Sequence, residues 1–384
     1  METNNEISIF INKFNKHKLH IGYFNFNLGW GGGENQIFNL ACWLHQLGLK
    51  VALVVIEDSV LLKKAELANL PVIPIKKSFS SSQIQTACKT HGINFLHVND
   101  SQSVKVGSFV ARKLGIPIVY SRRIASPIRK NYFSRRKYSL KNLDGVIAIS
   151  NTVKNVFKEC IAFPENRLFV VPSGIKVEEM ESICSDKSLR NKYAPNSCLI
   201  GGLGKLSKKK NWQMLVKVAD LCKKNGLDIR WIIAGEGPEK ENLKKLIEEY
   251  NLSDYVFLIG FKDNSTEIIK SLDVLFFSSL IEGASVTVRE AMILKTPVVA
   301  VNASGTAESL SGHGYVVAPD DLEASFAAIK ELLTNINQKN KIIDEAYCFA
   351  LKHFAFSQTI LGTLGAYDKI CEMKGIYEVR KYTN

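Results

Sequence analysis

The sequence has no apolar run long enough to cross a membrane. Such a segment needs about 18 consecutive apolar residues, and no run approaches that length although 46% of the 384 residues are apolar. The first ten residues, METNNEISIF, also lack the basic-then-apolar order of a secretory signal peptide. We therefore expect a globular cytoplasmic chain, and its length favours two domains over a single hydrophobic core.

Paired cysteines are absent as well. The eight cysteines stand singly, with no C-x-x-C pair for zinc and no clustering that would indicate a disulfide framework. They are Cys42, Cys88, Cys160, Cys184, Cys198, Cys222, Cys348 and Cys371. This pattern favours a reducing compartment.

Acidic residues are missing from the segment 122–141, although the chain has a formal net charge of +13. A net positive charge attracts nucleic acid, phosphorylated ligands or an acidic membrane face. Tyr132, Phe133 and Tyr138 interleave with the basic residues of this segment, a pattern that fits peripheral binding to an anionic membrane. An ordinary solvated helix face is the alternative. The residues expected to face the membrane are Arg129, Lys130, Arg135, Arg136 and Lys137.

Short apolar runs alternate with amphipathic stretches of helical period along the chain. The pattern begins at KLHIGYFNF and restarts at CLIGGLGKL, which predicts an α/β protein with two Rossmann-like domains and parallel sheets. We expect an N-terminal extension over 1–18, a first domain over 19–175, a second over 176–365 and a C-terminal helix over 366–384. The charged stretch 176–196 is the expected linker.

In such folds ligands bind beyond the carboxyl ends of the strands. The first such loop, GWGGGEN, carries Gly31, Gly32 and Gly33, which permit a close backbone approach, and a helix is expected to begin near Glu34. The loop matches the G-x-G-x-x-G dinucleotide fingerprint only in part because Glu34 occupies the third glycine position. A turn that is glycine-rich for steric reasons is the other alternative.

Two further loops carry polar residues after apolar runs. LHVNDSQS contains His97 and Asn99, although a lone histidine after a strand is more often a structural hydrogen-bonding residue than a catalyst. GKLSKKKN places Lys205 and Lys210 on a loop after a glycine-rich strand, where they could bind a diphosphate, while Lys208 and Lys209 fit a solvated surface.

The stretch EGASVTVRE places Glu282 and Glu290 eight positions apart. Ser285 is suited to cap a helix that begins at Val286, and Pro297 ends it. Glu290 lies one turn into that helix, so both carboxylates can address one ligand at its N-terminus. A helix N-terminus attracts phosphate, and carboxylates accept hydrogen bonds from hydroxyls. The stretch therefore predicts a site for a sugar attached to a phosphate.

These motifs together resemble the retaining glycosyltransferases of family 4. Their E-x7-E motif is present as Glu282 and Glu290, and their GG-x-E loop as Gly31, Gly32 and Glu34. Lys205 and Lys210 are similar to the family's phosphate loop, and NASGTAE to its glycine-rich turn, which ends here in Glu308. The resemblance runs in order from about residue 20 to 370 and implies the GT-B fold, two facing Rossmann-like domains.

The resemblance also implies roles for these residues. Glu290 would bind ribose hydroxyls, Glu282 the donor sugar, and Lys205 with Lys210 the leaving diphosphate of a UDP- or GDP-sugar. No cofactor or metal is implied, and the chain contains no D-x-D pair for a nucleotide-bound metal. The donor-binding residues would be Gly32, Gly33, Lys205, Lys210, Glu282, Gly283, Ala284, Ser285, Val286 and Glu290; the acceptor-binding residues Glu34, His97, Asn99 and Arg122; and the catalytic residues Glu282, His97, Lys205 and Lys210.

This sequence departs from the family's pattern at three positions. Lys205 stands where arginine is common, Asn99 replaces the second histidine of an H-x-H pair, and Asn35 replaces an arginine. Two of these departures, Asn99 and Asn35, lie in the first domain, which is expected to bind the acceptor.

We expect a transfer that retains anomeric configuration, by same-face substitution in which the leaving phosphate helps to deprotonate the acceptor. A double displacement through Glu282 is the alternative. The expected acceptor is a lipid-linked or saccharide hydroxyl of an envelope glycan such as lipopolysaccharide, reached at the cytosolic face of the inner membrane. A helix at the end of the chain would return to the first domain, as a hinge or as plain packing.

Other function classes stay open at this point. A nucleotide-sugar epimerase or a sugar phosphorylase could use the same fold. A catalytically silent membrane scaffold would bind vesicles without nucleotide sugars. A nucleic-acid-binding protein is motivated by net charge alone, and we do not expect nucleic acid as a partner.

Overall fold

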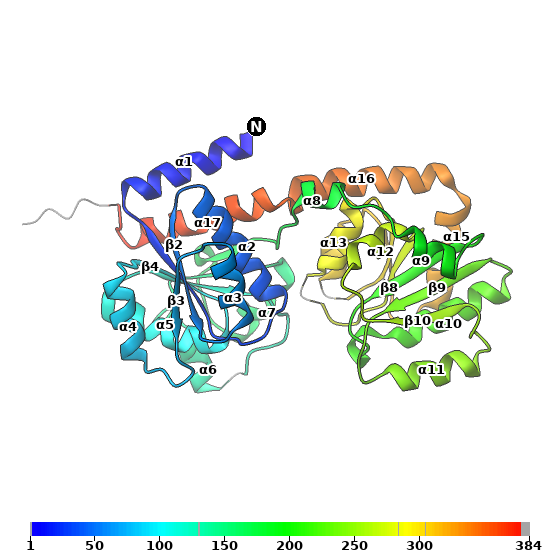
Figure 1. The fold of residues 1–384 in the computed structure, drawn as a ribbon, viewed down its shortest axis with the longest axis horizontal. Coiled ribbons are helices and arrows are strands. Elements are labelled where there is room, and N and C mark those ends of the chain that lie inside the picture. The colour runs from blue at the N-terminus through cyan, green and yellow to red at the C-terminus, as the bar shows by residue number, and fades with distance from the viewer. Residues whose placement is uncertain (1, 130, 283, 304, 378–384) are drawn as a thin grey trace, which may run out of the picture. The chain divides into compact units, whose positions relative to one another are not determined.

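The computed structural model describes residues 2–129, 131–282, 284–303 and 305–377, so the predictions for Lys130 and Gly283 lie outside the described residues. The chain divides into two compact units, here called unit 1 (residues 1–174 and 357–384) and unit 2 (residues 175–356). Each unit contains its own parallel sheet with helices packed on it (Figure 1). The predicted α/β class and pair of Rossmann-like domains are confirmed.

The sheet of unit 1 has seven parallel strands in the order β3-β2-β1-β4-β5-β6-β7. Its strands are short apolar runs that are buried along most of their length, as expected where helices cover both faces of a parallel sheet. The strands are β1 (His20–Asn25), β2 (Lys50–Ile56), β3 (Val72–Ile75), β4 (Phe95–Val98), β5 (Ile118–Arg122), β6 (Gly145–Ala148) and β7 (Leu168–Val170).

Most crossover helices of unit 1 begin at polar caps that the sequence places after the strands. Ser80 accepts a hydrogen bond from the backbone of Gln83 in a capping box, and Asp100 caps the next helix in the same way. The crossover elements are α2 (Gly32–Gln46), α3 (Val60–Leu67), α4 (Ser81–Thr90), α5 (Ser101–Leu114), α6 (Tyr132–Lys137), α7 (Asn151–Cys160) and the 3₁₀ turn Glu165–Arg167.

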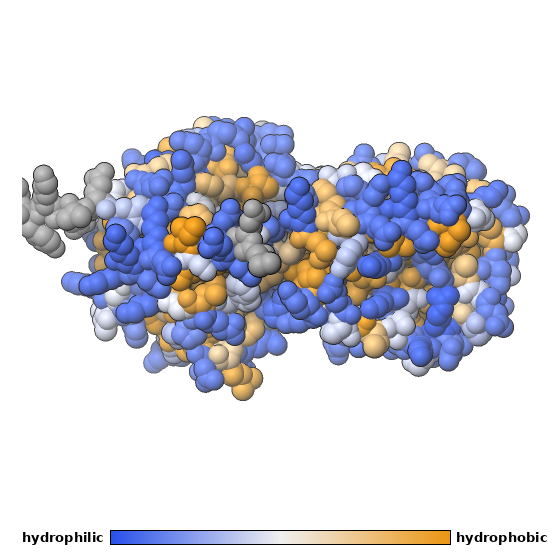
Figure 2. Space-filling view, turned by 90° about the horizontal axis from the view of Figure 1, so that it is seen from above, coloured by the Kyte–Doolittle hydropathy of each residue, from blue (hydrophilic) through white to orange (hydrophobic). Residues whose placement is uncertain are grey.

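The N-terminal segment is a packed helix rather than a simple extension. Helix α1 (Glu2–Lys16) buries Ile7, Ile11 and Phe14. Its Lys13 Nζ lies 2.6 Å from Asp368 Oδ1 on α17 (Phe356–Met373), the helix that returns to unit 1. The side of unit 1 that carries α1 has a largely hydrophilic surface with small separate apolar patches (Figure 2).

Unit 2 repeats the strand order of the first six strands of unit 1, as β10-β9-β8-β11-β12-β13. The strands are β8 (Cys198–Leu203), β9 (Ile229–Ala234), β10 (Val256–Gly260), β11 (Val274–Phe277), β12 (Val298–Val301) and β13 (Tyr315–Val317). The helical elements are α8 (Val177–Glu181), α9 (Lys187–Tyr193), the 3₁₀ turn Lys208–Lys210, α10 (Trp212–Lys224), α11 (Lys240–Glu249), α12 (Ser265–Ser271), α13 (Val286–Ile293), α14 (Thr306–Leu310), α15 (Leu322–Thr334) and α16 (Ile336–Phe354).

The chain passes between the units twice, and the two passing segments pair with each other. Ile175 forms a parallel bridge with Ala355, donating its N–H to Phe354 and accepting one from Phe356. The second boundary lies at 356/357, nine residues before the predicted 365/366, because α17 already begins at Phe356. The expected linker 176–196 instead contains α8 and α9 of unit 2.

Candidate functional site

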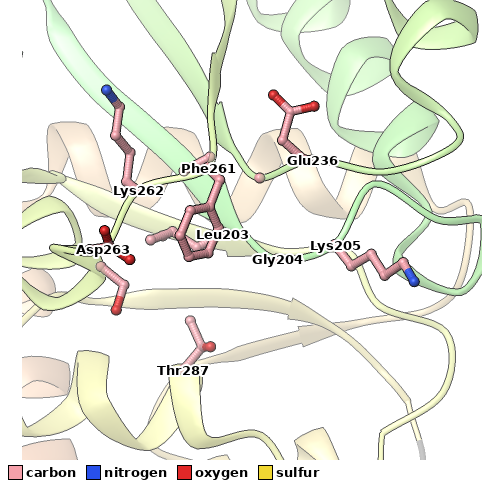
Figure 3. A pocket seen from close by; sticks show the side chains of 11 residues that line it. Leu203, Gly204, Lys205, Glu236, Phe261, Lys262, Asp263 and Thr287 are labelled. Atoms are coloured by element: carbon pink, nitrogen blue, oxygen red, sulfur yellow. The ribbon is translucent and has the colours of Figure 1, made fainter. Parts of the chain in front are cut away.

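Unit 2 has a cavity of about 490 Å³ beyond the carboxyl ends of β8, β9 and β10. Figure 3 shows the ring of Phe261 inside it, with Thr287 below and the side chains of Lys205 and Lys262 extending in opposite directions. This is the edge at which open α/β sheets bind ligands. The lining residues are Leu203, Gly204, Lys205, Ala234, Gly235, Glu236, Phe261, Lys262, Asp263, Ser265 and Thr287.

Glycine backbones hold two of these strand-end loops together. Gly204 and Gly235 have φ angles of +149° and +154°, in a region that side chains disfavour. A Cβ on Gly235 would lie 1.9 Å from the carbonyl oxygen of Gly204. The two loops therefore meet through their main chains beside the cavity.

Lys210 and Glu282 form an ion pair at the rim of the sheet. Ser279 Oγ donates to the same Glu282 oxygen at 2.9 Å, and Ser278 Oγ donates to the carbonyl of Lys210 at 2.7 Å. Both charged side chains are largely covered, so the pair is better shielded from solvent than a surface salt bridge. The structure thus brings together two residues that the sequence predicted for one site, whereas Lys205 lines the cavity.

Helix α13 begins as the sequence predicted, with Ser285 Oγ accepting from the backbone N–H of Val288 at 3.3 Å. Burial raises the pKa of Glu290, one turn into this helix, to about 7. Among the other predicted donor residues, Ala284 is half-buried and Val286 is exposed at the first turn. A carboxylate with such a pKa changes its charge near neutral pH, so its affinity for hydroxyl groups depends on pH.

Arg289 next to Glu290 is a core residue. Its guanidinium lies 4.3 Å from the ring centroid of Phe354, and it is almost fully buried. Burial lowers the pKa of Arg289 to about 10, and the charge of Glu308 opposes that shift. Glu308, which the sequence linked to the site through NASGTAE, therefore acts electrostatically on α13.

In unit 1 the glycine loop is organised by Glu34. Its carboxylate accepts from Asn25 Nδ2 at 3.1 Å and from Asn27 Nδ2 at 2.8 Å. Burial alone would raise the pKa of Glu34, but these hydrogen bonds and backbone N–H groups of the loop together lower it. Glu34 is thus an ionised, 9% exposed residue that fixes the start of α2.

The space beside Gly32 and Gly33 is open. A Cβ at Gly32 would meet nothing within 4 Å, and one at Gly33 would meet only the Cδ of Arg123, at 3.8 Å. The packing of the described residues therefore does not require glycine at these positions. A ligand that approaches the backbone amides of α2 would explain them.

His97 is an internal residue. It is 2% exposed, its Nδ1 lies 2.5 Å from Tyr367 Oη, and its Nε2 lies 2.6 Å from Ser121 Oγ. Tyr367 Oη is in turn 2.9 Å from Tyr23 Oη. Burial lowers the pKa of His97 to about 3, with the charge of Arg123 adding to the shift. This geometry is that of the structural histidine that the sequence left as an alternative, while a catalytic, acceptor-binding role of His97 stays a prediction.

Arg122, predicted to bind the acceptor, is also an internal residue. It is 3% exposed, donates from Nη2 to the carbonyl of Ser126, and lies 6.0 Å from the ring centroid of Phe157. Its Nη2 is used inside unit 1, while its Nε is buried with no hydrogen-bond partner among the described residues. Asn99, the third predicted acceptor residue of this region, is half-buried, and its Oδ1 has no hydrogen-bond partner among the described residues.

Comparison with known proteins identifies the family. The model described as "Glycosyltransferase Family 4" matches residues 30–179, and "Glycosyl transferases group 1" matches residues 185–348. Between them they cover every strand except β1. The chain is a family 4 glycosyltransferase.

Two sequence relatives and one solved structure show how similar this glycosyltransferase is to known proteins. The N-acetylgalactosamine-N,N'-diacetylbacillosaminyl-diphospho-undecaprenol 4-alpha-N-acetylgalactosaminyltransferase of Campylobacter jejuni is 23% identical over 82% of this chain and 90% of its own length. An uncharacterised glycosyltransferase of Methanocaldococcus jannaschii is 27% identical, but the match covers only 43% of this chain and 41% of that protein. Anabaena HepE, crystallised with UDP, is 18% identical, has a TM-score of 0.79 and covers 92% of this chain and 99% of its own. The last shows that the glycosyltransferase shares the GT-B fold.

The basic aromatic segment of the glycosyltransferase forms an exposed surface. Tyr132 and Phe133 of α6 are 67% and 81% exposed, and Arg135, Arg136 and Lys137 occupy the last turn of the same helix. Arg129 is exposed as well. Among the helices that the structure describes, none is both long enough and apolar enough to cross a bilayer.

The sequence reasoning missed three residues at the two sites. Phe261 and Thr287 line the cavity of unit 2, and Arg123 lies beside the glycine loop of unit 1. Each follows a signal that was available: Phe261 and Arg123 come directly after a strand, and Thr287 is in the first turn after the predicted cap.

Proposed function

We propose that this glycosyltransferase moves a sugar, with retention of configuration, from a nucleoside-diphosphate sugar held by unit 2 to a hydroxyl of a lipid-linked or saccharide acceptor in envelope glycan assembly. The observation that carries the proposal is the arrangement on α13 and the preceding loop, where Glu290 and the Lys210–Glu282 ion pair lie on the carboxyl side of one sheet. That arrangement offers carboxylates for hydroxyls and a cation for phosphate.

The cavity supports a nucleotide as the donor's anchor. Phe261 is 69% exposed and lines the cavity, which suits an aromatic face for a base. Glu290 would accept hydrogen bonds from ribose hydroxyls, and Lys205 and Lys210 would bind the diphosphate. The UDP in the crystal structure of HepE makes uridine the first base to test, with guanosine as the alternative.

The chemistry we propose takes place on one face of the sugar. The bond between the anomeric carbon and the phosphate oxygen breaks while the acceptor oxygen bonds to that carbon from the same side. The acceptor's proton passes to the departing diphosphate. Lys205 and Lys210 stabilise the negative charge that grows on this leaving group, and this stabilisation would be the largest contribution to the rate. Glu282 orients the sugar; a covalent glycosyl ester at Glu282 would contradict this mechanism.

The acceptor is proposed from the name of the Campylobacter relative, which acts on a diphospho-undecaprenol-linked sugar, and from the exposed basic segment around α6. Together they support peripheral binding at the cytosolic face of an anionic membrane. Replacing Arg135, Arg136 and Lys137 by Gln should weaken co-sedimentation with anionic vesicles, because each basic residue near the surface contributes about 1 kcal/mol. The matched control replaces Lys240, Lys244 and Lys245 of α11 by Gln. If both variants lose vesicle binding equally, the binding depends on net charge and not on the α6 segment.

Ligand-dependent thermal stability tests the donor assignment directly. With chelator present, a nucleoside diphosphate at a hundredfold its dissociation constant should add about 2.7 kcal/mol of stability. We expect UDP to stabilise the wild type but not Glu290→Ala, while Glu249→Ala on α11 serves as the matched control. Stabilisation only after Mg²⁺ is added would contradict the metal-independent donor site, and turnover without an acceptor would favour an epimerase.

A further inference from the structure

Unit 1 has a cavity at the sheet edge opposite to its glycine loop. Its volume is about 530 Å³, which is in the range of small-molecule sites. His20 and Lys50 line it; they are the first residues of β1 and β2 and are direct partners in the parallel register. Val72, the first residue of β3, lines it as well. The cavity therefore lies at the amino ends of three strands, whereas the glycine loop follows the carboxyl end of β1.

Four basic side chains from four different elements line this cavity, and they are here called the basic cluster. Lys50 belongs to β2 and His20 to β1. His45 lies in the last turn of α2, and His91 is the C-cap residue of α4. None of the lining residues, all of which are described, is Asp or Glu. A cleft that carries charge of one sign concentrates ligands of the opposite sign.

Much of the remaining lining is apolar. Leu49, Ala52 and Ile73 are buried residues that line the cavity, and Pro71 and Val72 also contribute to its wall. Such a wall stabilises a bound ligand by removing apolar surface from water. The cavity thus combines cationic groups with an apolar wall, which is the complement of an organic anion.

The members of the basic cluster act on one another electrostatically. Burial lowers the pKa of His20, and the charges of Lys50 and His91 add to this shift. Hydrogen bonds to the backbone of His91 and Gly92 oppose it. A bound anion would relieve the repulsion between the cations. Anion binding and protonation of the histidines therefore favour each other.

Metal ions and organic cations fit this cavity less well. Neutral histidines bind transition metals, but the described residues contain no group of three or more His, Cys, Asp or Glu that could hold a metal ion. A cation drawn to the C-termini of α2 and α4 would meet the ammonium group of Lys50. Carbonyl groups at both helix ends already accept backbone hydrogen bonds, among them those from Leu49 and Ile93.

We propose that this cavity binds a small organic anion, a molecule with an apolar body and one carboxylate or phosphate group, and that the basic cluster holds the anionic group. The apolar body lies against Leu49, Ala52 and Ile73. This site goes beyond the proposed glycosyl transfer and does not rest on it, because none of the residues proposed for the donor or the acceptor lines the cavity.

Titration calorimetry on the full chain with naphthalene probes tests the proposal. At pH 7 we expect naphthalene-2-sulfonate to bind at least roughly tenfold more tightly than neutral 2-naphthalenemethanol, the scale of one charge-assisted hydrogen bond. Lys50→Gln should weaken binding of the sulfonate by about the same factor and leave the alcohol unchanged. Lys113→Gln, at an exposed lysine in the last turn of α5 that does not line the cavity, is the matched control. Comparison of 2-naphthoate with 2-naphthyl phosphate then identifies the preferred anionic group.

The pH dependence of binding gives a second measurement. The sulfonate stays ionised between pH 5.5 and pH 8, so any change in its affinity comes from the protein. The titratable and charged groups that line the cavity are Lys50, His20, His45 and His91. We expect the affinity to rise severalfold as the pH falls through this range, because an anion binds protonated histidines more tightly. Replacing both His20 and His91 by Gln should flatten that rise.

Several results would overturn the proposal. They are equal affinity for the sulfonate and the alcohol, equal weakening in Lys50→Gln and Lys113→Gln, binding that requires added Zn²⁺, and displacement of the sulfonate by UDP. Absence of sulfonate binding to the wild type would overturn it as well. Failure of the wild type to bind UDP would instead contradict only the proposed function. Should the double histidine variant not fold, His91→Gln, at an exposed position, takes its place.

Discussion

The two sheets of this glycosyltransferase share a strand order but use different means to shape their ligand edges. In unit 2 the strand-end loops meet main chain to main chain, at Gly204 and Gly235, and the cation Lys210 is already paired with Glu282. In unit 1 side chains organise the edge, where the Glu34 carboxylate accepts hydrogen bonds from Asn25 and Asn27. The comparison teaches that contacts between main chains shape the strand-end edge of unit 2, whereas hydrogen bonds between side chains shape that of unit 1.

The largest expected effect is a difference in stability between two glycine substitutions. The packing requires glycine at position 235 but not at position 32. Gly235→Ala should destabilise unit 2 by about 3 kcal/mol or more, since its Cβ would overlap the carbonyl of Gly204 at a φ of +154°. Gly32→Ala meets no neighbour and should change stability by less than about 1 kcal/mol. Urea denaturation of both variants is the measurement. Equal losses would remove the distinction between the two edges.

Breaking the preformed ion pair should chiefly affect turnover. Lys210→Ala removes the cation beside the leaving diphosphate and should lower kcat on the order of 10²- to 10³-fold, the range seen when one stabilising group of a transition state is lost. Steady-state kinetics with the donor identified by thermal shift provide the test. Lys208→Ala, a neighbouring lysine of the same turn, is the control; a similar loss in it would argue for a general charge effect.

Removing His97 should affect stability rather than chemistry. His97→Gln would disturb hydrogen bonds to Tyr367 and Ser121 in a buried site and should cost about 1–3 kcal/mol. The folded pKa of His97 lies near 3, below its ordinary 6.5. The unfolded chain therefore binds more protons between these values, and stability falls as pH drops through that window.

Urea denaturation at pH 7 and pH 5 measures this slope. The loss of stability on acidification should be smaller in His97→Gln than in the wild type, while kcat at pH 7 should stay close to normal once the variant is folded. A kcat that collapses in a fully folded variant would instead support a catalytic role for His97.

The smallest expected effect is a change of UDP affinity with pH that depends on Glu290. Because its folded pKa of about 7 lies above the ordinary 4.5, its contribution to stability is complete below about pH 4.5 and is lost as pH rises through about 7. The ionised form is the better acceptor for ribose hydroxyls. We expect UDP affinity to rise severalfold from pH 6 to pH 8 in the wild type and to stay flat in Glu290→Gln. A slope retained in the variant would assign the titration to another group.

The sequence predicted the sheets and the loops well because local signals define them. Apolar runs give the strands, Ser285 gives the start of α13, and glycines mark the loops that carry the site. Where a side chain points was not predictable. Arg122 and Arg123 are adjacent and chemically identical, and only the packing of Phe157 and Ser126 decides that Arg122 turns inward.

The role of His97 could not be predicted for a related reason. Its partner Tyr367 lies 270 positions away on α17, and no spacing or periodicity links the two. The same holds for α1: its amphipathic pattern is visible, but the surface of α17 that receives it exists only in the folded chain.

The return of α17 to unit 1 has a consequence for how the protein is made. On the ribosome, residues 1–174 emerge first, but the apolar face of α17 that covers them, including Ile360, Leu364, Tyr367 and Ile370, follows only after all of unit 2. At 5–20 residues per second, this delay is roughly 10 to 40 s. During that time the surface of the first sheet that α17 later covers stays exposed. Unit 2 is continuous in the chain, so it should reach its native state before unit 1 does.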